Sequence, residues 1–147
     1  MLDEKDSAIL AVLRRDSRRS TKAIAAELDI PRATVHERIR RMSERGVIKG
    51  FTIMLDHAQV GEPVTAFILV SFLPTPSVSQ RSLANKIAAL EGVQEVHLIS
   101  GEYDILAKVR GASIEKIGSM VIDQIRMLEG VGRTLTCTSF AAIRDDV

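Results

Sequence analysis

Residues 20–50 read STKAIAAELDIPRATVHERIRRMSERGVIKG and contain two helical patterns separated by a break. In the first pattern Ile24 and Leu28 lie about one turn apart. Ser20 or Thr21 is the N-cap candidate, because the hydroxyl of either can accept a free backbone N–H. Residues 29–31, Asp-Ile-Pro, interrupt the pattern, because Asp tolerates a left-handed turn and Pro is favoured only at the start of a helix. The residues that follow are therefore expected to form a separate helix.

The second pattern places Val35, Ile39 and Met42 at i, i+4 and i+7, so these side chains share one helical face. Gly46 is expected to end this helix, because glycine adopts the left-handed conformation of a helix end without a steric penalty. The apolar pair at 47–48 is expected to begin a strand.

A further helix is expected before these two helical patterns, beginning near Asp3 or Asp6 and ending near Asp16. The negative charge of either aspartate at the start suits a helix N-terminus. The apolar stripe of this helix consists of Ile9, Val12 and Leu13. Three helices with a tight turn before the third form the helix-turn-helix arrangement, in which the third helix enters the major groove of DNA. The alternative is a helical bundle whose charged face is merely solvated.

Charge is unevenly distributed along the chain, although the net charge of the whole is only +1. Residues 1–50 contain twelve Lys and Arg against eight Asp and Glu, a balance of +4. Residues 51–147 contain eight against eleven, a balance of −3. Since a basic surface attracts the phosphates of double-stranded DNA, the first fifty residues are the expected DNA-binding domain.

The helical wheel of the third helix divides the DNA-contact candidates into two groups. Side chains in its first turns are placed to reach base edges, whereas basic side chains elsewhere are better placed for phosphates, which position a protein without reading sequence. The base-reading candidates are Arg32, Thr34 and His36. The remaining DNA-contact candidates are Arg18, Arg19, Ser20, Lys22, Arg38, Arg40 and Arg41.

Composition excludes several other classes of protein. With 46% hydrophobic and 27% charged residues, the 147-residue chain is typical of a soluble globular protein, and no apolar run approaches the length of a membrane span. The single cysteine, Cys137, cannot form an intrachain disulfide. The histidines are too far apart in sequence to suggest a metal motif: His36, His57 and His97. We expect a cytoplasmic protein without a metal or cofactor, and no pattern of catalytic residues indicates an enzyme.

The second half of the chain has a different periodicity. Residues 64–73, VTAFILVSFL, are apolar on both alternations, as in a strand buried on both faces. Further strands are expected over 93–99, 104–110 and 133–143, the middle two joined by a hairpin turn at 100–103. One helix stripe consists of Leu83, Ile87 and Leu90 and is expected to stop at Gly92, and the other of Ile114, Ile117, Val121, Ile125 and Leu128, ending at Gly130. The order β-α-β-β-α-β predicts an α+β chain with a ferredoxin-like second domain.

Two helices can cover only one face of such a sheet, and the first strand offers apolar side chains to both. Phe67 and Leu69 point to one side, whereas Ala66, Ile68, Val70 and Phe72 point to the other. The uncovered face needs a partner, so we expect a homodimer formed sheet to sheet, which also suits pseudo-palindromic DNA half-sites. The alternative is that residues 50–60 fold over this face within one chain.

Taken together, the residues resemble the Lrp/AsnC feast-or-famine regulators of bacteria and archaea, over essentially the whole chain. Each piece of the resemblance is weak alone, but their order and spacing together are specific. The matching pieces are LDEKD at 2–6, IL at 9–10, AIA at 23–25, TVHERI at 34–39, GVIKGF at 46–51, EGV at 91–93, SGEYD at 100–104, GV at 130–131 and Thr136.

The resemblance implies a winged helix-turn-helix domain over residues 1–50, a linker strand or hinge over 51–62, and a ferredoxin-like effector-binding and oligomerisation domain over 63–147. It implies a sequence-specific transcriptional regulator assembled as homodimers, and often as tetramers or octamers. Effectors of the family, usually amino acids, bind between dimers. The effector residues that it implies here are Leu98, Ser100, Gly101, Glu102, Tyr103 and Asp104, together with Ile114, Asp123, Thr136 and Thr138.

The chemistry of these residues suits an amino acid zwitterion. The glycine turn offers free backbone N–H groups to a carboxylate, and Glu102, Asp104 or Asp123 offers acceptors to an ammonium group. The alternative is structural: Gly101 shapes a hairpin that Asp104 caps.

The chain departs from the family pattern just before the third helix. Many members have Ser as the N-cap of the recognition helix and Gly in the preceding turn, where this chain has Pro31 and Asp29. Pro31 cannot act as a side-chain cap, so the start of the helix could shift by a residue and change what Arg32 contacts.

Two other function classes share features with this sequence. The sirohaem decarboxylases resemble the same family, but they carry a His and aromatic residues near the hairpin, whereas residues 101–107 here contain neither His nor Trp. A nucleoid-type protein would bind DNA with little sequence choice, and footprinting would distinguish its uniform coverage from the discrete sites of a regulator.

Overall fold

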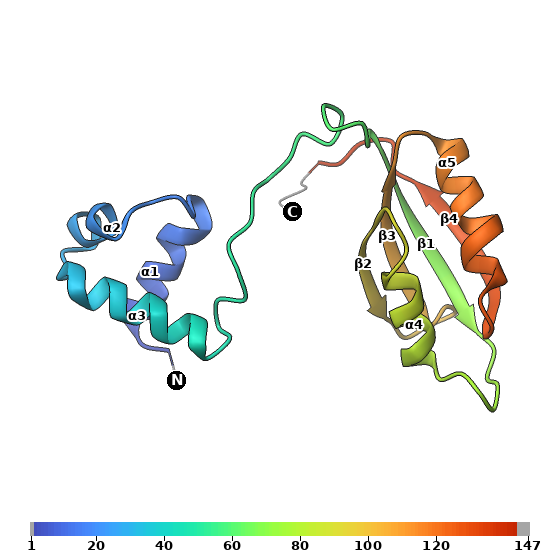
Figure 1. Cartoon of the computed structure of the whole chain (residues 1–147), viewed down its shortest axis with the longest axis horizontal. Helices are drawn as coiled ribbons and strands as arrows, with labels where there is room; N and C mark the ends of the chain where they lie inside the picture. Colours follow the sequence, from blue (N-terminus) through green and yellow to red (C-terminus); the bar gives the residue numbers. More distant parts are fainter. Residues whose placement is uncertain (1, 144–147) are drawn as a thin grey trace. The chain divides into compact units, whose positions relative to one another are not determined.

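The computed structural model describes residues 2–143, and the chain forms two compact units, residues 1–54 and 55–147. The first unit contains the three helices α1 (Glu4–Arg15), α2 (Thr21–Leu28) and α3 (Arg32–Glu44) (Figure 1). Their apolar stripes meet in one small core, as the sequence predicted. Its buried members are Ile9, Val12, Leu13, Ile24, Ile30, Val35 and Met42.

Side chains at the first two helix starts satisfy free backbone N–H groups. Asp3 forms a capping box with Asp6: its carboxylate accepts the Asp6 N–H at 2.8 Å, and the Asp6 carboxylate accepts the Asp3 N–H at 3.3 Å. The Ser20 hydroxyl oxygen caps α2 by accepting the N–H of Ala23 at 3.1 Å. These caps fix where α1 and α2 begin.

The turn between α2 and α3 has the conformation expected from its residues. Asp29 is left-handed, with φ of 51°, and Pro31 occupies the N-cap of α3 without a side-chain cap. At the other end of α3, Gly46 has φ of 69° and donates its N–H to the Ser43 carbonyl. The Val47 N–H donates to the Met42 carbonyl, which completes a Schellman motif.

The expectation that a strand begins at 47–48 is wrong. Both Val47 and Ile48 donate their N–H groups to the Met42 carbonyl, so these donors close the helix instead of entering a strand ladder. Residues 47–63 contain no strand, since no segment of the described chain pairs with them. The apolar side chains of Phe51, Ile53 and Met54 in this segment are exposed.

The second unit contains four strands and two helical segments in the predicted β-α-β-β-α-β order (Figure 1). The strands are β1 (Val64–Phe72), β2 (Val93–Leu98), β3 (Ile105–Gly111) and β4 (Val131–Thr138). All neighbouring strands are antiparallel, in the spatial order β2-β3-β1-β4. Strands β2 and β4 therefore form the two edges of the sheet. The fold is ferredoxin-like, as the sequence predicted.

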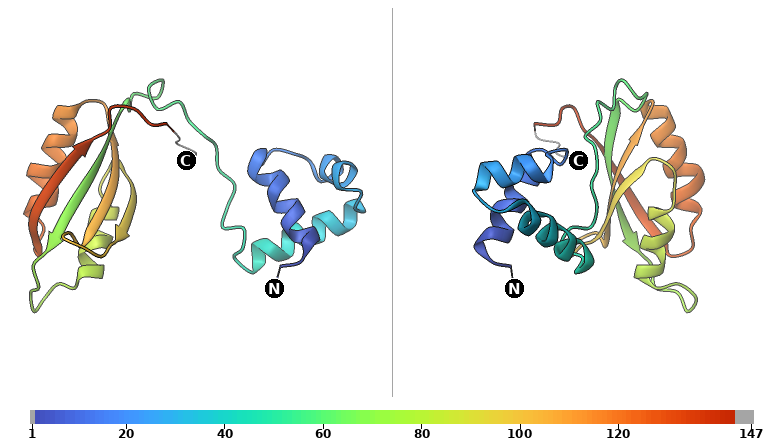
Figure 2. Two further views of the ribbon diagram at one scale, coloured as in Figure 1. Left: turned by 180° about the vertical axis from the view of Figure 1, so that it is seen from behind. Right: turned by 60° about the vertical axis from the view of Figure 1, so that its left-hand side comes forward.

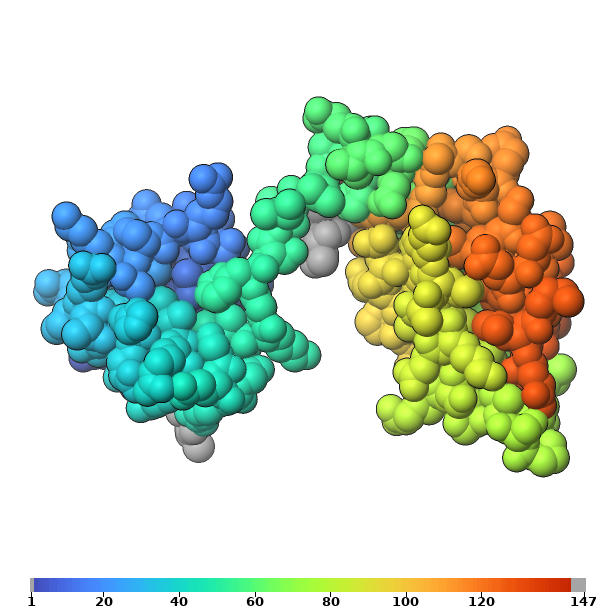
Figure 3. All heavy atoms as spheres, in the orientation of Figure 1, coloured from blue at the N-terminus to red at the C-terminus, as the bar shows by residue number. Residues whose placement is uncertain are grey.

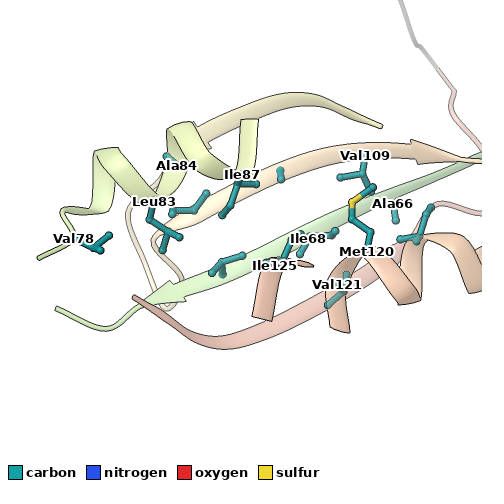
Figure 4. Close-up of a cluster of buried hydrophobic side chains, with 14 residues drawn as sticks. Ala66, Ile68, Val78, Leu83, Ala84, Ile87, Val109, Met120, Val121 and Ile125 are labelled. Carbon is teal, nitrogen blue, oxygen red and sulfur yellow. The ribbon is translucent and has the colours of Figure 1, made fainter. Parts of the chain in front are cut away.

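Helix α4 (Gln80–Ala88) and the segment that starts with α5 (Ile114–Ser119) lie on the same side of this sheet (Figure 2). In the space-filling view both segments are visible on one face of the second unit (Figure 3). They cover the side chains of Ala66, Ile68 and Val70, which are fully buried. Figure 4 shows the resulting core, in which Leu83 and Ile87 of α4 and residues of the second segment pack onto the strands. Gly92 connects α4 to β2 with φ of 83°.

The second helical segment is not an α-helix throughout. After α5 the chain forms a π-helical turn, η1 (Met120–Gln124), and a short 3₁₀ turn, η2 (Ile125–Met127). The extra residue in the π turn brings Met120 and Ile125 onto the buried side, at a spacing of five. Ile114, which a regular helix would place on the buried stripe, is 60% exposed.

Strand β4 also differs from its expected bounds. It begins at Val131 and ends at Thr138, whereas the sequence predicted a strand over 133–143. β4 pairs with β1 only as far as the contact between Thr138 and Ala66, and beyond that point Phe140 and Ile143 are exposed. One further hydrogen bond, from the Ser139 N–H to the Thr65 carbonyl, follows the last pair of this ladder.

The other face of the sheet carries apolar side chains that no part of residues 2–143 covers completely. Phe67 is 37% and Leu135 is 45% exposed, and they alternate with the buried residues of their strands. Leu69 and Leu106 lie opposite each other in the ladder on the same face, beside the exposed Cys137.

Candidate functional site

Two of the three predicted base-reading side chains lie around one hollow in the first unit. Thr21 of α2 and Arg32, Ala33 and His36 of α3 line a concavity of about 380 Å³. Arg32 and His36 are exposed, whereas Thr34 is half-buried. The structure therefore brings two of the three predicted readers together at an accessible surface.

Arg38 is held inside the first unit. Its Nη1 atom lies 2.7 Å from Oδ1 of Asp6 and 2.7 Å from Oδ2 of Asp3, and its side chain is 20% exposed. The hydrogen bond from Arg38 lowers the pKa of Asp6, and the hydrogen bonds to Asp3 and Asp6 raise the pKa of Arg38. This predicted phosphate ligand instead joins α3 to the start of α1.

Arg40 and Arg19 each pair with exposed glutamates. Arg40 lies 2.7 Å from Glu37, whose pKa it lowers by hydrogen bonding, and it also pairs with Glu44. Arg19 pairs with Glu27. Exposed pairs of this kind contribute little to stability, so either guanidinium can exchange its carboxylate for a phosphate.

The other predicted phosphate contacts are accessible. Arg18, Lys22 and Arg41 are exposed and form no ion pair within residues 2–143. Ser20 uses its hydroxyl oxygen as the α2 cap and can still donate the hydroxyl proton to a phosphate oxygen.

The predicted effector turn lies between β2 and β3. Ser100, Gly101 and Glu102 are exposed, as is Leu98 at the end of β2, and Gly101 has φ of 130°. The Gly101 N–H donates to no backbone carbonyl among the described residues, and no atom lies within 4 Å of a Cβ built at this position.

A residue that the sequence did not single out covers part of this turn. The Arg133 guanidinium lies 3.2 Å from the Glu102 carboxylate and 5.6 Å from the centroid of the Tyr103 ring. These contacts join the start of β4 to the turn across the end of β1. The ion pair with Arg133 also occupies the Glu102 carboxylate, which was predicted to accept hydrogen bonds from the ammonium group of an effector.

Asp104 makes structural contacts at the end of β1. Its Oδ2 accepts the Phe72 N–H at 2.7 Å, and its backbone N–H donates to the Val70 carbonyl at 3.0 Å. Gln80 of α4 donates to the Asp104 carbonyl at 3.1 Å. The carboxylate therefore holds the hairpin onto β1, where the ladder between β1 and β4 is irregular.

Three of the remaining predicted effector residues line a second hollow, of about 180 Å³, beside β4. They are Ile114, Thr136 and Thr138, and the fourth, Asp123 on η1, is exposed but does not line it. The complete lining is Ile114, Ile117, Gly118, Val121, Ile122, Arg126, Thr136 and Thr138.

Within one chain, the turn and the second hollow are separate. No residue of the turn lines the hollow, although Arg133 of β4 contacts Glu102 and Tyr103 of the turn. Arg126, which lines the hollow, was not predicted because its position follows from the π turn that precedes it. The predicted effector residues thus form two groups, not one.

Among the residues that the structure describes, no group of three or more His, Cys, Asp or Glu side chains could hold a metal ion. In the same part of the chain, no helix has the length and apolar character needed to cross a membrane.

Comparison with known sequences matches both units of the chain. Residues 65–147 match the Lrp/AsnC ligand binding domain, and residues 2–49 match a winged helix-turn-helix DNA-binding domain. An uncharacterized HTH-type transcriptional regulator of Pyrococcus furiosus is 40% identical over 147 residues, which is 100% of this chain and 98% of that protein. The HTH-type transcriptional regulator LysM of Sulfurisphaera tokodaii is 41% identical over 133 residues, covering 88% of this chain and 89% of LysM.

Solved structures show the same fold. Escherichia coli AsnC superposes with a TM-score of 0.87 at 25% identity, covering 99% of this chain and 96% of AsnC. A transcriptional regulator of Neisseria meningitidis, solved in complex with L-methionine, superposes with a TM-score of 0.89 at 20% identity, covering 99% of this chain and 94% of its own.

Proposed function

Because the chain belongs to the Lrp/AsnC family of DNA-binding transcriptional regulators, we propose that it binds specific DNA sites and that a small effector changes its DNA affinity or its oligomeric state. We assign DNA binding to residues 1–50 and effector binding and oligomerisation to residues 63–147, joined by residues 51–62. The observation that carries this proposal is the combination of an exposed reading surface on α3 with a ligand-binding domain in one chain.

The DNA-binding mode follows from the exposed charges of the first unit. Arg32 and His36 beside the hollow at the start of α3 present hydrogen-bonding groups of the kind that read base edges in the major groove. Arg18, Lys22 and Arg41 supply accessible positive charge for the phosphates on either side.

A homodimer is supported by the open face of the sheet. Phe67 and Leu135 expose apolar surface next to Leu69 and Leu106, and a second copy of the same face would bury it. Such a twofold dimer presents two α3 helices to two DNA half-sites.

A higher assembly is supported by the separation of the two groups of effector residues. No residue of the turn that contains Gly101 lines the hollow that contains Thr136. In a tetramer or octamer of dimers, the turn of one chain can complete the hollow of another. An amino acid effector is supported by the open backbone N–H of Gly101 and by the methionine complex of the Neisseria relative.

The test combines footprinting on genomic fragments with a thermal-shift screen against the twenty amino acids. A regulator protects discrete sites, and a ligand at a hundred times its dissociation constant stabilises the folded chain by about 2.7 kcal/mol. Uniform protection would instead indicate an architectural DNA-binding protein. If no amino acid shifts the melting temperature or the footprint, the effector part of the proposal is wrong.

A further inference from the structure

Glu37 lies on the exposed face of α3, the helix to which DNA reading is assigned. Val35 and Met42 are buried on the opposite side of this helix, whereas Ala33 and Glu37 are exposed and, at a spacing of four residues, share one face. Ala33 lines the hollow at the start of α3, so Glu37 follows that hollow by one turn. A carboxylate on such a surface opposes binding, because duplex DNA carries one negative charge per ~1.7 Å of its axis.

Arg40 holds the Glu37 carboxylate along the helix. The Arg40 Nη2 donates to Oε1 of Glu37 at 2.7 Å, and the Arg40 Nε donates to Oε2 of Glu37 at 3.0 Å. The side-chain hydrogen bonding from Arg40 lowers the pKa of Glu37, so this carboxylate is ionised at neutral pH. An ionised carboxylate has no donor and more acceptor sites than these two hydrogen bonds use. Glu37 can therefore contact DNA only by accepting hydrogen bonds.

Few base edges in the major groove offer hydrogen-bond donors. Cytosine presents its N4 amino group, and adenine presents its N6 amino group beside the N7 acceptor, which repels a carboxylate. Guanine and thymine present acceptors at the corresponding positions, so either base would leave the Glu37 carboxylate without a donor and partly desolvated. A polar group left in this state costs more binding free energy than a formed hydrogen bond contributes. An ionised Glu37 therefore suits cytosine and disfavours guanine and thymine.

Glu44 provides an internal comparison on the same helix. It also pairs with Arg40, at 2.5 Å, and its side chain is 55% exposed against 52% for Glu37. Glu44 is the last residue of α3, whereas Glu37 is its sixth residue. Because recognition helices contact base edges with their N-terminal residues, only Glu37 is placed to read a base.

We infer that Glu37 is a specificity-determining residue, which accepts a hydrogen bond from the N4 amino group of one cytosine under each α3, and that Arg40 is its positioning residue. The inference rests on the proposed function, because it requires α3 to enter the major groove of DNA. It adds a base identity to that function. The specificity arises mainly from the weaker binding of sites that place another base there, since the affinity difference between sites is what a regulator discriminates by.

The test uses the full chain and selects its binding sites from a pool of random DNA duplexes. Glu37→Gln is expected to change the selected base at one position of the site from cytosine to adenine, because a glutamine amide pairs with the N6 and N7 atoms of adenine. On the site selected by the unmodified chain, replacing this C·G pair by T·A is expected to weaken binding by about tenfold. Glu37→Gln is expected to reduce that difference.

Glu44→Gln is the matched control, because it removes the same charge from the other carboxylate that pairs with Arg40. It is expected to strengthen binding to all duplexes without changing the selected site. Both variants are expected to keep the melting temperature of the unmodified chain, since exposed ion pairs contribute little to stability.

Three outcomes would contradict the inference. If Glu37→Gln selects the same site as the unmodified chain, Glu37 reads no base. If the unmodified chain selects a base other than cytosine at the position that Glu37→Gln alters, the assignment to cytosine is wrong, while specific DNA binding stands. If the unmodified chain selects no site at all, the proposed sequence-specific binding is wrong as well.

Discussion

The Arg38 guanidinium on α3 lies 2.7 Å from the Asp6 carboxylate on α1, and that carboxylate is only 2% exposed. The contact joins two residues that are 32 positions apart in sequence. It couples the orientation of the DNA-reading helix to the capping box at the start of α1.

Arg38→Gln and Arg41→Gln are expected to weaken DNA binding in different ways. Arg41 is exposed, so its loss removes about one phosphate contact and lowers the slope of log affinity against log salt by about one. Arg38 is held by carboxylates, so its loss is expected to lower the melting temperature and the affinity without changing that slope. Salt titrations on one operator together with thermal melts measure both effects. A reduced slope for Arg38→Gln would show that Arg38 contacts a phosphate.

The stability of the first unit is expected to depend on acid through Asp6. The hydrogen bond from Arg38 lowers the folded-state pKa of Asp6, so the pair stabilises the fold above the unfolded pKa of about 4 and loses this contribution as pH falls through the lowered value. Unfolding of residues 1–54 measured from neutral pH downwards is expected to show this loss. Asp6→Asn is expected to be less stable at neutral pH and less sensitive to acid, and equal acid sensitivity in both proteins would contradict the assignment.

Phe67→Glu and Leu135→Arg are expected to convert the proposed homodimer into monomers, because each places a charge on the open face of the sheet. Light scattering gives the mass directly. Ala88→Arg is the control, since Ala88 is exposed on α4 at the opposite face. A monomeric unmodified chain, or charged variants that remain dimers, would exclude this face as the interface.

Gly101→Val and Asp104→Ala are both expected to abolish the effector response, but only the second through a lost structural contact. Valine at Gly101 strains a φ of 130° and blocks the open N–H of the turn. Asp104→Ala removes the acceptor of the Phe72 N–H, and its unfolding free energy is expected to fall by about 1–3 kcal/mol. Calorimetry with the effector and denaturant unfolding separate the two effects. Full ligand affinity in both variants would remove the turn from the site.

Gly92→Ala is expected to destabilise the second unit by about 1–3 kcal/mol. A Cβ at this position would lie 2.6 Å from the Arg110 carbonyl oxygen, and φ is 83°. Gly118→Ala is the matched control, because no atom lies within 4 Å of its Cβ and alanine favours the helix there. Denaturant unfolding gives the free energy of unfolding of both variants. An equal loss in the two would mean that the chain relieves the contact between the new Cβ and the Arg110 carbonyl oxygen without losing stability.

Periodicity was sufficient to predict most of the elements. The predicted helical stripe is buried at Val35 and Met42 and half-buried at Ile39. The predicted alternation of the first strand is buried at Ala66, Ile68 and Val70 and half-buried at Phe72. Local chemistry at Asp29, Pro31 and Gly46 marked the ends of helices correctly, because these residues act through their own backbone conformations.

Only the tertiary structure decided which residues pair with the polar side chains and where the backbone departs from regular helix or strand. The engagement of Arg38 by Asp6 and of Asp104 by the Phe72 N–H depends on residues at least 32 positions away, which no local pattern specifies. The strand expected at 47–48 is absent because those donors close α3, and a π turn that no local pattern marked interrupts the second helical segment after Ser119. The sequence by itself determined the order of elements and the family, since apolar spacing and turn residues act locally. The composition of the candidate sites depends on packing between distant segments, and this only the folded chain determines.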